Sequence, residues 1–167
     1  MSITAVRVGQ GFDIHRFSDD PNRPLVLGGV TFEGARGLEG HSDADAIAHA
    51  CADALLGAAG LGDIGQHFPD TDPQWKGVES LKLLDHVAML VRAQGWVIGN
   101  IDCSVVCEQP KLAPRREEMQ QKLSTATGAP VSVKGRRAEG LGALGRQEGI
   151  ACWAVAVIFQ VENRSEV

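Results

Sequence analysis

Strand-like and helical segments alternate along the chain, and their order restricts the folds that it can adopt. Short apolar, β-branched runs predict strands, and apolar residues at helical spacing predict helices. The predicted strands cover residues 5–11, 24–30, 100–112, 130–135 and 149–159. The predicted helices cover residues 42–57, 79–95 and 113–127. This order predicts an α/β or α+β sandwich, in which one mixed β-sheet carries helices packed on one face.

Length and composition predict a single globular domain. The chain has 167 residues, of which 44% are hydrophobic, and we expect a domain over 1–160 with a loose tail at 161–167. A net charge of −5 without a basic stripe argues against nucleic-acid binding. The longest apolar run, 150–159, is too short to span a bilayer, and the first residues do not resemble a signal peptide. We therefore expect a cytoplasmic protein without membrane contact.

The cysteines form no CxxC pair and lie in apolar or strand-like runs. They are predicted to be buried, reduced thiols. They are Cys51, Cys103, Cys107 and Cys152.

The helical stretch GHSDADAIAHACADALL, residues 40–56, carries polar residues that alanine would outperform as helix formers. Ser42 is predicted as the N-cap, with Asp45 three residues later as an acidic capping box. Asp45, His49 and Asp53 recur every four residues and share one face of the helix. Capping accounts for the first turn, but it gives His49 no role.

A candidate metal site combines this helix with the motif GFDIH. In a strand, Asp13 and His15 project from the same side. With His49 they make a three-ligand set, and three protein ligands with one open position are typical of catalytic zinc. Taken alone, the Asp-x-His pattern also fits a surface carboxylate beside an ordinary histidine.

Four further segments offer groups that could bind a phosphorylated substrate. Asp63, between glycines, could approach a substrate hydroxyl or follow a helix C-cap. The acids of 67–73 fit either a binding loop or an Asx-type turn. Lys111, just past a strand, could hold a phosphate. The segment 134–149 mixes glycines and cations with Glu139, a pattern suited to phosphates and a divalent cation.

The order of the motifs is more specific than any one of them. GFDIH, PLVLGGV, the block from His41 to Pro73, GNIDCSVVCEQPKL and GRQEGIA follow one another over roughly 6–159. Together they resemble the 2-C-methyl-D-erythritol 2,4-cyclodiphosphate synthase family of the non-mevalonate isoprenoid route. The resemblance implies a homotrimer with active sites between subunits and an axial cavity that can hold an isoprenoid diphosphate.

The implied reaction is a metal-dependent cyclisation of 4-diphosphocytidyl-2-C-methyl-D-erythritol 2-phosphate. The 2-phosphate attacks the β-phosphorus, CMP leaves, and the cyclic diphosphate forms.

The resemblance also implies residue roles. Zinc ligands are Asp13, His15 and His49, and the ligand of Mg²⁺ or Mn²⁺ is Glu139. His41 and Ser42 contact the phosphates, and Arg146 lies beside them. No direct substrate contact is implied for Asp45 or Asp53, and Asp45 is expected to cap the helix or to steady a ligand histidine. The walls around the methylerythritol are Asp63, Ile64, Gly65, Phe68, Pro69, Asp70, Thr71 and Asp72. The loop that holds the cytosine is Cys107, Glu108, Gln109, Pro110, Lys111, Leu112 and Ala113.

One segment departs from the family pattern. Where members usually read KATTTEKLGFTGR, this chain reads KGRRAEGLGALGR. Arg136 and Arg137 replace threonines, and Ala143 replaces phenylalanine. Arg137 stands where a threonine lies against the diphosphate, so it is predicted to be catalytic, with Arg136 and Ala143 at the substrate. The Arg137 guanidinium could pair with phosphate oxygens. Alternatively, the bulk of Arg137 could misplace the diphosphate. The smaller Ala143 could make room for this arginine.

We expect turnover to be retained. The alternatives are a non-catalytic trimer that binds metal and nucleotide or isoprenoid phosphates, and a phosphoesterase that releases a linear phosphate.

Overall fold

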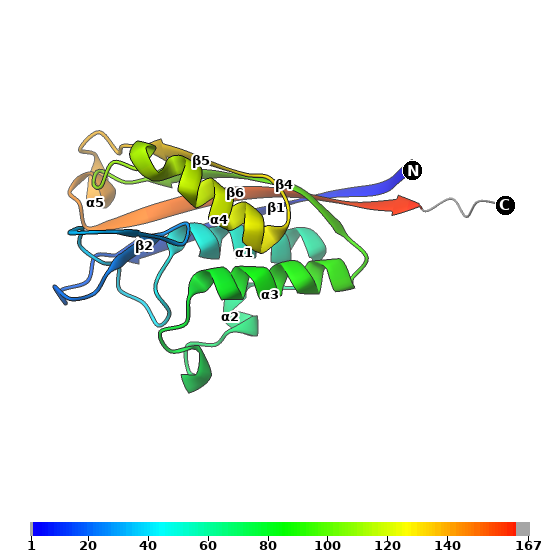
Figure 1. Ribbon diagram of the computed structural model, residues 1–167, viewed down its shortest axis with the longest axis horizontal. Coiled ribbons are helices and arrows are strands. Elements are labelled where there is room, and N and C mark those ends of the chain that lie inside the picture. Colours follow the sequence, from blue (N-terminus) through cyan, green and yellow to red (C-terminus); the bar gives the residue numbers. More distant parts are fainter. Residues whose placement is uncertain (1, 163–167) are drawn as a thin grey trace.

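The computed structural model describes residues 2–162 and is built on a four-stranded sheet in the order β1-β6-β4-β5 (Figure 1). Its strands are β1 (Ser2–Arg16), β4 (Val97–Val106), β5 (Val131–Arg136) and β6 (Gly149–Glu162). Strand β6 runs antiparallel to both of its neighbours, and β5 runs parallel to β4. The mixed sheet predicted from the sequence is confirmed.

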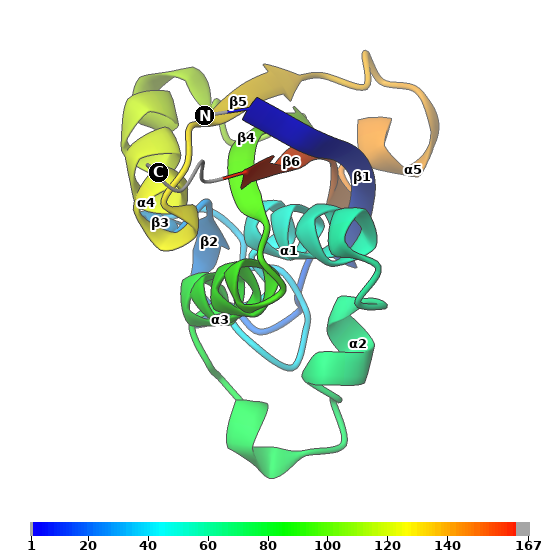
Figure 2. The same ribbon diagram turned by 90° about the vertical axis from the view of Figure 1, so that its right-hand side faces the viewer.

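Three long helices gather on one side of this sheet (Figure 2). They are α1 (Ala46–Ala59), α3 (Ser80–Ala93) and α4 (Arg116–Thr127). The shorter helices are α2 (Ile64–His67), η1 (Pro73–Trp75), η2 (Ala113–Arg115) and α5 (Gly142–Gly145). The segment 60–77, expected to be a loop, thus contains two short helical turns, which shape one of the cavities described below.

Helix α1 packs unusually close to strand β1. A Cβ atom built on Gly11 would lie 2.0 Å from the carbonyl oxygen of Ala50, and one on Gly9 would lie 2.0 Å from that of Ala54. Glycine in the strand and alanine in the helix therefore let the two backbones approach each other. This approach brings His49 of α1 beside Asp13 of β1.

Two predictions about local structure were wrong. Residues 24–30 are not one strand: β2 (Leu25–Leu27) and β3 (Val30–Phe32) form a hairpin around Gly28 and Gly29. The N-cap of α1 is not Ser42 but Asp45, for which capping was one of two expected roles. The buried Asp45 carboxylate accepts bonds from two amides of the first helical turn and from the amides of Gly28 and Gly29. Asp45 therefore accepts hydrogen bonds from the helix and from the hairpin at once, which Ser42, four residues before the helix, could not do.

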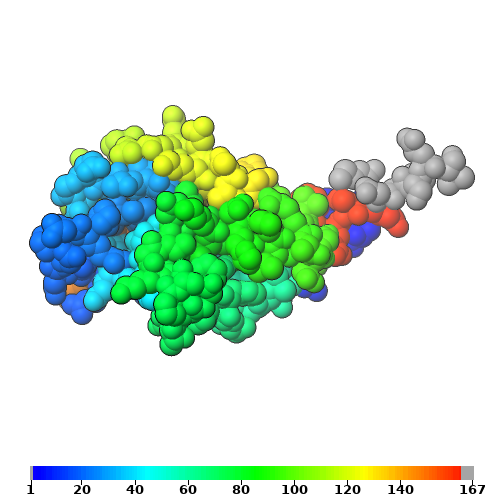
Figure 3. Space-filling model, turned by 60° about the horizontal axis from the view of Figure 1, so that its bottom comes forward, coloured from blue at the N-terminus to red at the C-terminus, as the bar shows by residue number. Residues whose placement is uncertain are grey.

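The side of the sheet away from the long helices exposes apolar side chains, which we call the open face. Val8 is 64% exposed on β1, and Trp153 and Val155 are 41% and 43% exposed on β6. Phe12 packs beside Trp153 with ring centroids 4.8 Å apart. Such a patch on one side of a sheet is typical of a surface that another chain covers. The ends of β1 and β6 also project from the body (Figure 3).

The remaining expectations concern the chain ends, the thiols and the membrane. Strand β6 continues to Glu162, two residues past the predicted domain boundary, and the rest of the predicted tail lies outside the described residues. All four cysteines are free and buried, as predicted. Within residues 2–162, no helix has the length and apolar character needed to cross a bilayer.

Candidate active site

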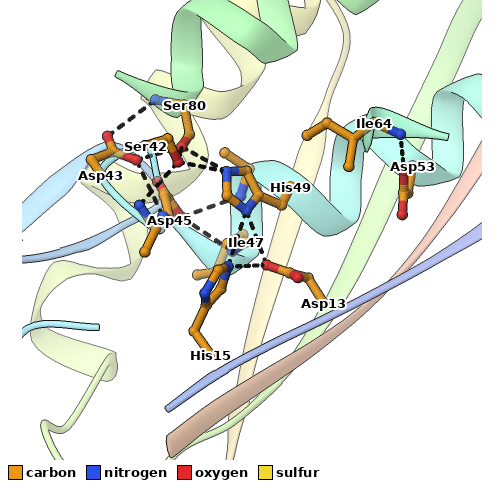
Figure 4. A network of polar contacts seen from close by, with 12 residues as sticks. Asp13, His15, Ser42, Asp43, Asp45, Ile47, His49, Asp53, Ile64 and Ser80 are labelled. Atoms are coloured by element: carbon orange, nitrogen blue, oxygen red, sulfur yellow. Dashed lines mark hydrogen bonds and ion pairs between the residues drawn. The ribbon is translucent and has the colours of Figure 1, made fainter. Parts of the chain in front are cut away.

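Asp13, His15 and His49 meet between β1 and α1 (Figure 4). Asp13 Oδ2 lies 2.9 Å from His15 Nε2 and 3.1 Å from His49 Nδ1. The two histidine nitrogens are 3.2 Å apart. The strand alternation that places Asp13 and His15 on one side, and the helix approach that adds His49, together produce a compact set of three donors.

These distances fit a bound metal ion. A tetrahedral ion with ligand bonds of about 2.0–2.2 Å holds its ligand atoms roughly 3.3–3.6 Å apart, slightly farther than the three donors lie here. The three side chains are 24%, 18% and 12% exposed, so the cluster is partly open to solvent. One carboxylate and two imidazoles, open on one side, can hold a metal and leave room for a further ligand.

The cluster also shifts the protonation of its members. Burial alone would raise the pKa of Asp13, but the hydrogen bonds from His15 and His49 outweigh it and hold that pKa well below its ordinary value. Burial disfavours a charged His15, yet the hydrogen bond to Asp13 raises its pKa. The carboxylate of Asp13 therefore favours a proton on His15 when no metal ion is bound between them.

Contacts on the far side of each imidazole fix the orientation of the ring. His15 Nδ1 lies 2.7 Å from the carbonyl oxygen of Glu39, so this nitrogen donates to it, and Nε2 can present a lone pair once a metal ion displaces its proton. His49 Nε2 lies 2.9 Å from the Ser80 hydroxyl and 3.1 Å from the Ser42 hydroxyl, with Nδ1 turned to the cluster. Both tautomers suit metal binding.

Two residues of this outer layer, Ser80 and Asp43, were not predicted from the sequence. The Ser80 hydroxyl donates to Asp43, and the Ser80 amide donates to the same carboxylate at 3.1 Å. Asp53, which was given no substrate contact, accepts from the Ile64 amide at 2.8 Å and ties α2 to α1.

A cavity of about 300 Å³ adjoins the three-donor cluster of Asp13, His15 and His49. Its lining residues are His15, Gly40, His41, Ser42, His49, Ile64, Gly65, Phe68, Asp70, Trp75 and Leu83. It therefore brings the two predicted phosphate contacts and four of the predicted methylerythritol-binding residues to the three-donor cluster. Trp75 and Leu83 carried no signal in the sequence that would have placed them here.

The other four residues of that predicted wall do not line this cavity. Asp63 is the N-cap of α2, and Asp72 is the N-cap of η1. Pro69 and Thr71 stand in the same loop without a lining role. A role for these four residues at the substrate stays a prediction.

A second cavity, of about 240 Å³, lies at the ends of β4 and β5. Its lining residues are Cys107, Glu108, Gln109, Pro110, Lys111, Leu112, Ala113, Arg116, Gly135, Arg136 and Arg137. All seven residues of the predicted cytosine loop are among them. The two cavities share no residue.

The other predicted residues of 134–149 lie outside both cavities. Glu139 sits in the turn after β5 with a positive φ of 53° and does not join the three-donor cluster. Ala143 is in α5, and Arg146, the C-cap of α5, pairs with Glu148 at 2.7 Å. A role for these three residues at the substrate stays a prediction.

Comparison with known proteins decides the family. A model of the YgbB family matches residues 6–159. The chain belongs to the YgbB family. Over 158 residues it is 55% identical to the bifunctional enzyme IspD/IspF of Anaeromyxobacter dehalogenans, covering 93% of this chain but 40% of that enzyme. Over 156 residues it is 52% identical to 2-C-methyl-D-erythritol 2,4-cyclodiphosphate synthase of Thermosynechococcus vestitus, covering 92% of this chain and 96% of the relative.

Solved structures of the YgbB family agree with the fold described above. The IspF–CDP complex of Plasmodium falciparum superposes with a TM-score of 0.82 at 33% identity, covering 96% of this chain and all of that one. The resemblance to the cyclodiphosphate synthase family is confirmed, and with it the prediction that the chain is an enzyme of that class. The three-donor cluster of this YgbB-family chain accords with the predicted metal binding.

Proposed function

We propose that the protein converts 4-diphosphocytidyl-2-C-methyl-D-erythritol 2-phosphate into 2-C-methyl-D-erythritol 2,4-cyclodiphosphate and CMP. The observation that carries this proposal is the metal cluster of Asp13, His15 and His49 at the edge of a cavity lined by His41 and Ser42. Relatives that match nearly the whole chain carry the name of this synthase. The names of these relatives do not favour the non-catalytic alternative.

The metals are part of the proposal. Zinc would be held by Asp13, His15 and His49, and Mg²⁺ or Mn²⁺ by Glu139 together with substrate phosphates. Such ions, when bound, offset the negative charge on the reacting phosphoryl groups. The identity of each ion rests on the donor types: an Asp and two His for zinc, and a single carboxylate for the harder cation.

The residues of the chain would hold the two phosphates in line. An oxygen of the 2-phosphate forms a bond to the β-phosphorus, and the bond from that phosphorus to the bridging oxygen of the α-phosphate breaks. The electron pair leaves with CMP. His41 and Ser42 would bind the phosphates beside the metal cluster, and Arg146 would act from the neighbouring loop. Positioning of this kind supplies much of the acceleration of an intramolecular reaction.

The second cavity is proposed to bind the cytidine part. A relative was solved with CDP, according to its title. In this chain the residues from Cys107 to Ala113 enclose a cavity of about 240 Å³ beside three cations. Backbone groups of this loop would recognise the base, and the cations would face the phosphates.

A homotrimer is the assembly that this arrangement supports. The cavity beside the three-donor cluster and the proposed nucleotide cavity have no residue in common, so one substrate could reach both where two subunits meet. The open face offers an apolar surface for such a contact. The same proposal includes an isoprenoid diphosphate in the axial cavity and, following the sequence-based expectation, a cytoplasmic location.

The test is CMP release from the diphosphocytidyl substrate by purified protein with zinc and magnesium, with the second product identified by phosphorus NMR. We expect metal-dependent CMP and the cyclic diphosphate, both lost with chelator and strongly reduced in Glu139→Ala. A linear phosphate would instead establish a phosphoesterase. A folded, metal-loaded protein that releases no CMP would indicate a binding role.

A further inference from the structure

Arg137 does not stand free beside the proposed nucleotide cavity but pairs with Glu108. Its Nε and Nη2 atoms each lie 3.0 Å from Glu108 Oε2. The second carboxylate oxygen accepts from the Gly140 amide at 3.4 Å. The Glu108 side chain is 6% exposed, whereas that of Arg137 is 66% exposed. Glu108 is thus covered by its neighbours, and its charge is met entirely from the segment 137–140.

This pair joins two segments at the ends of parallel strands. Glu108 comes two residues after the end of β4, and Arg137 directly follows β5. Val106 and Arg136 are partners in the ladder, and the Cys107 amide donates to the Arg136 carbonyl at 2.9 Å. Beyond this last backbone bond, the Glu108–Arg137 pair continues the connection through side chains. It therefore ties the loop 107–113 to the turn that carries Glu139.

The charges around the cavity divide into one compensated cation and three free ones. Glu108 is the single acid that lines the cavity. In the part of the chain that the structure describes, Lys111, Arg116 and Arg136 form no ion pair. Because Glu108 offsets the charge of Arg137, the positive charge left for an anionic ligand comes from the other three. Two nitrogens of the Arg137 guanidinium meet one oxygen of Glu108 while the Gly140 amide meets the other, which restrains both side chains and suits a structural link.

We propose that Arg137 is a positioning residue: paired with Glu108, it holds the loop 107–113 and the following turn in the shape that binds a nucleoside diphosphate, and it leaves Arg136 to face the phosphates. This inference rests on the proposed function and deepens it. It assigns Arg137 an indirect role, where its place in the sequence had predicted direct contact with the diphosphate.

The two roles predict different effects of removing the Glu108 carboxylate. If Arg137 acts through the pair, Arg137→Ala and Glu108→Gln damage the same structure, and the double variant is no worse than either single one. If Arg137 contacts the phosphates directly, Arg137→Ala lowers kcat, while Glu108→Gln frees the guanidinium and leaves kcat unchanged or raises it. A double-mutant cycle therefore separates them.

The experiment measures CDP affinity by calorimetry, and kcat and KM for CMP release, in the full-length protein and the three variants. We expect each single variant to weaken CDP binding and raise KM by about tenfold, with a smaller change in kcat and no further loss in the double variant. Lys82→Ala, which breaks an exposed ion pair with Glu79 on α3, is the matched control and should change neither quantity. Glu108→Gln is nearly isosteric, so its CDP affinity and KM still test the role of the pair if Arg137→Ala fails to fold.

Four results would overturn the inference. Wild-type CDP affinity in both single variants would refute it while leaving the proposed function intact. So would additive losses, or a lower kcat confined to Arg137→Ala. A wild-type protein that neither binds CDP nor releases CMP would refute the proposed function and, with it, this inference.

Discussion

The Nε2 atom of His49 lies 2.9 Å from the hydroxyl oxygen of Ser80, which joins the first turn of α1 to the first residue of α3. Ser80 donates in turn to Asp43, and the Ser42 hydroxyl lies 3.2 Å from that of Ser80. The imidazole is therefore held from behind while Nδ1 faces Asp13. An outer contact of this kind sets the tautomer and the angle of a metal-binding histidine.

Ser80→Ala should weaken zinc binding by about 10- to 100-fold, the usual effect of removing an outer partner of a metal ligand. Affinity would be measured by competition with a coloured chelator. The matched control is Thr125→Ala on α4, where the lost hydroxyl donates only to the Gln121 carbonyl. Equal zinc affinity in the two variants would show that packing, rather than Ser80, orients His49.

Part of this site could be predicted from the sequence because the spacing of its residues is short. Alternation in a strand places Asp13 beside His15, and the four-residue spacing of polar residues in an alanine-rich helix singles out His49. Ser80 could not be predicted, because it follows His49 by 31 residues and begins a separate helix. Its proximity results from the packing of α3 on α1.

The errors in the fold have a similar origin. Ser42 and Asp45 are both good capping residues, and local preference cannot choose between them. The choice is made by the hairpin turn at Gly28 and Gly29, whose amides also bind Asp45. The Glu108–Arg137 pair likewise depends on β4 and β5 being parallel neighbours, which strand patterns alone do not specify.

The metal-free protein should have a stability optimum in mildly acidic solution. The pKa of Asp13 is lowered from its ordinary 3.8, so its contribution is complete above that value and is lost as the pH falls toward the lowered pKa. The pKa of His15 is raised from 6.5, so its contribution is complete below that value and is lost as the pH rises through the raised pKa. Together they stabilise most between these two ordinary values.

Thermal unfolding of chelator-treated protein from pH 3 to 9 would test this expectation. In Asp13→Asn the His15 contribution should disappear, so the decline above neutral pH should flatten. Zinc affinity should show the opposite trend and rise with pH, because the ion displaces the proton from His15 Nε2. The same decline above neutral pH in wild type and Asp13→Asn would exclude the pair as its cause.

Gly11→Ala should destabilise the protein by about 1–3 kcal/mol or more, because the new Cβ atom would lie 2.0 Å from the Ala50 carbonyl oxygen and force α1 away from β1. Zinc affinity should fall with it, since His49 moves with the helix. Gly57→Ala is the control: the nearest atom to its Cβ is the Gln10 carbonyl oxygen at 3.8 Å, and an alanine inside a helix should add up to about 1 kcal/mol. Urea unfolding of both variants gives the comparison, and equal midpoints would show that α1 does not need this close approach.

Val8→Glu should dissociate the assembly that we propose. Val8 is 64% exposed at the open face, and a carboxylate there would be buried without a partner if that face lies between subunits. Analytical ultracentrifugation of the wild type should give three times the chain mass of 17.7 kDa, and the variant should sediment as a single chain. Met89→Glu on α3 is the control, because Met89 is similarly exposed, at 58%, but lies on a helix. CMP release should fall in Val8→Glu alone, since only the assembly would bring a metal cavity to a nucleotide cavity; a Val8→Glu protein that remains trimeric would place the interface elsewhere.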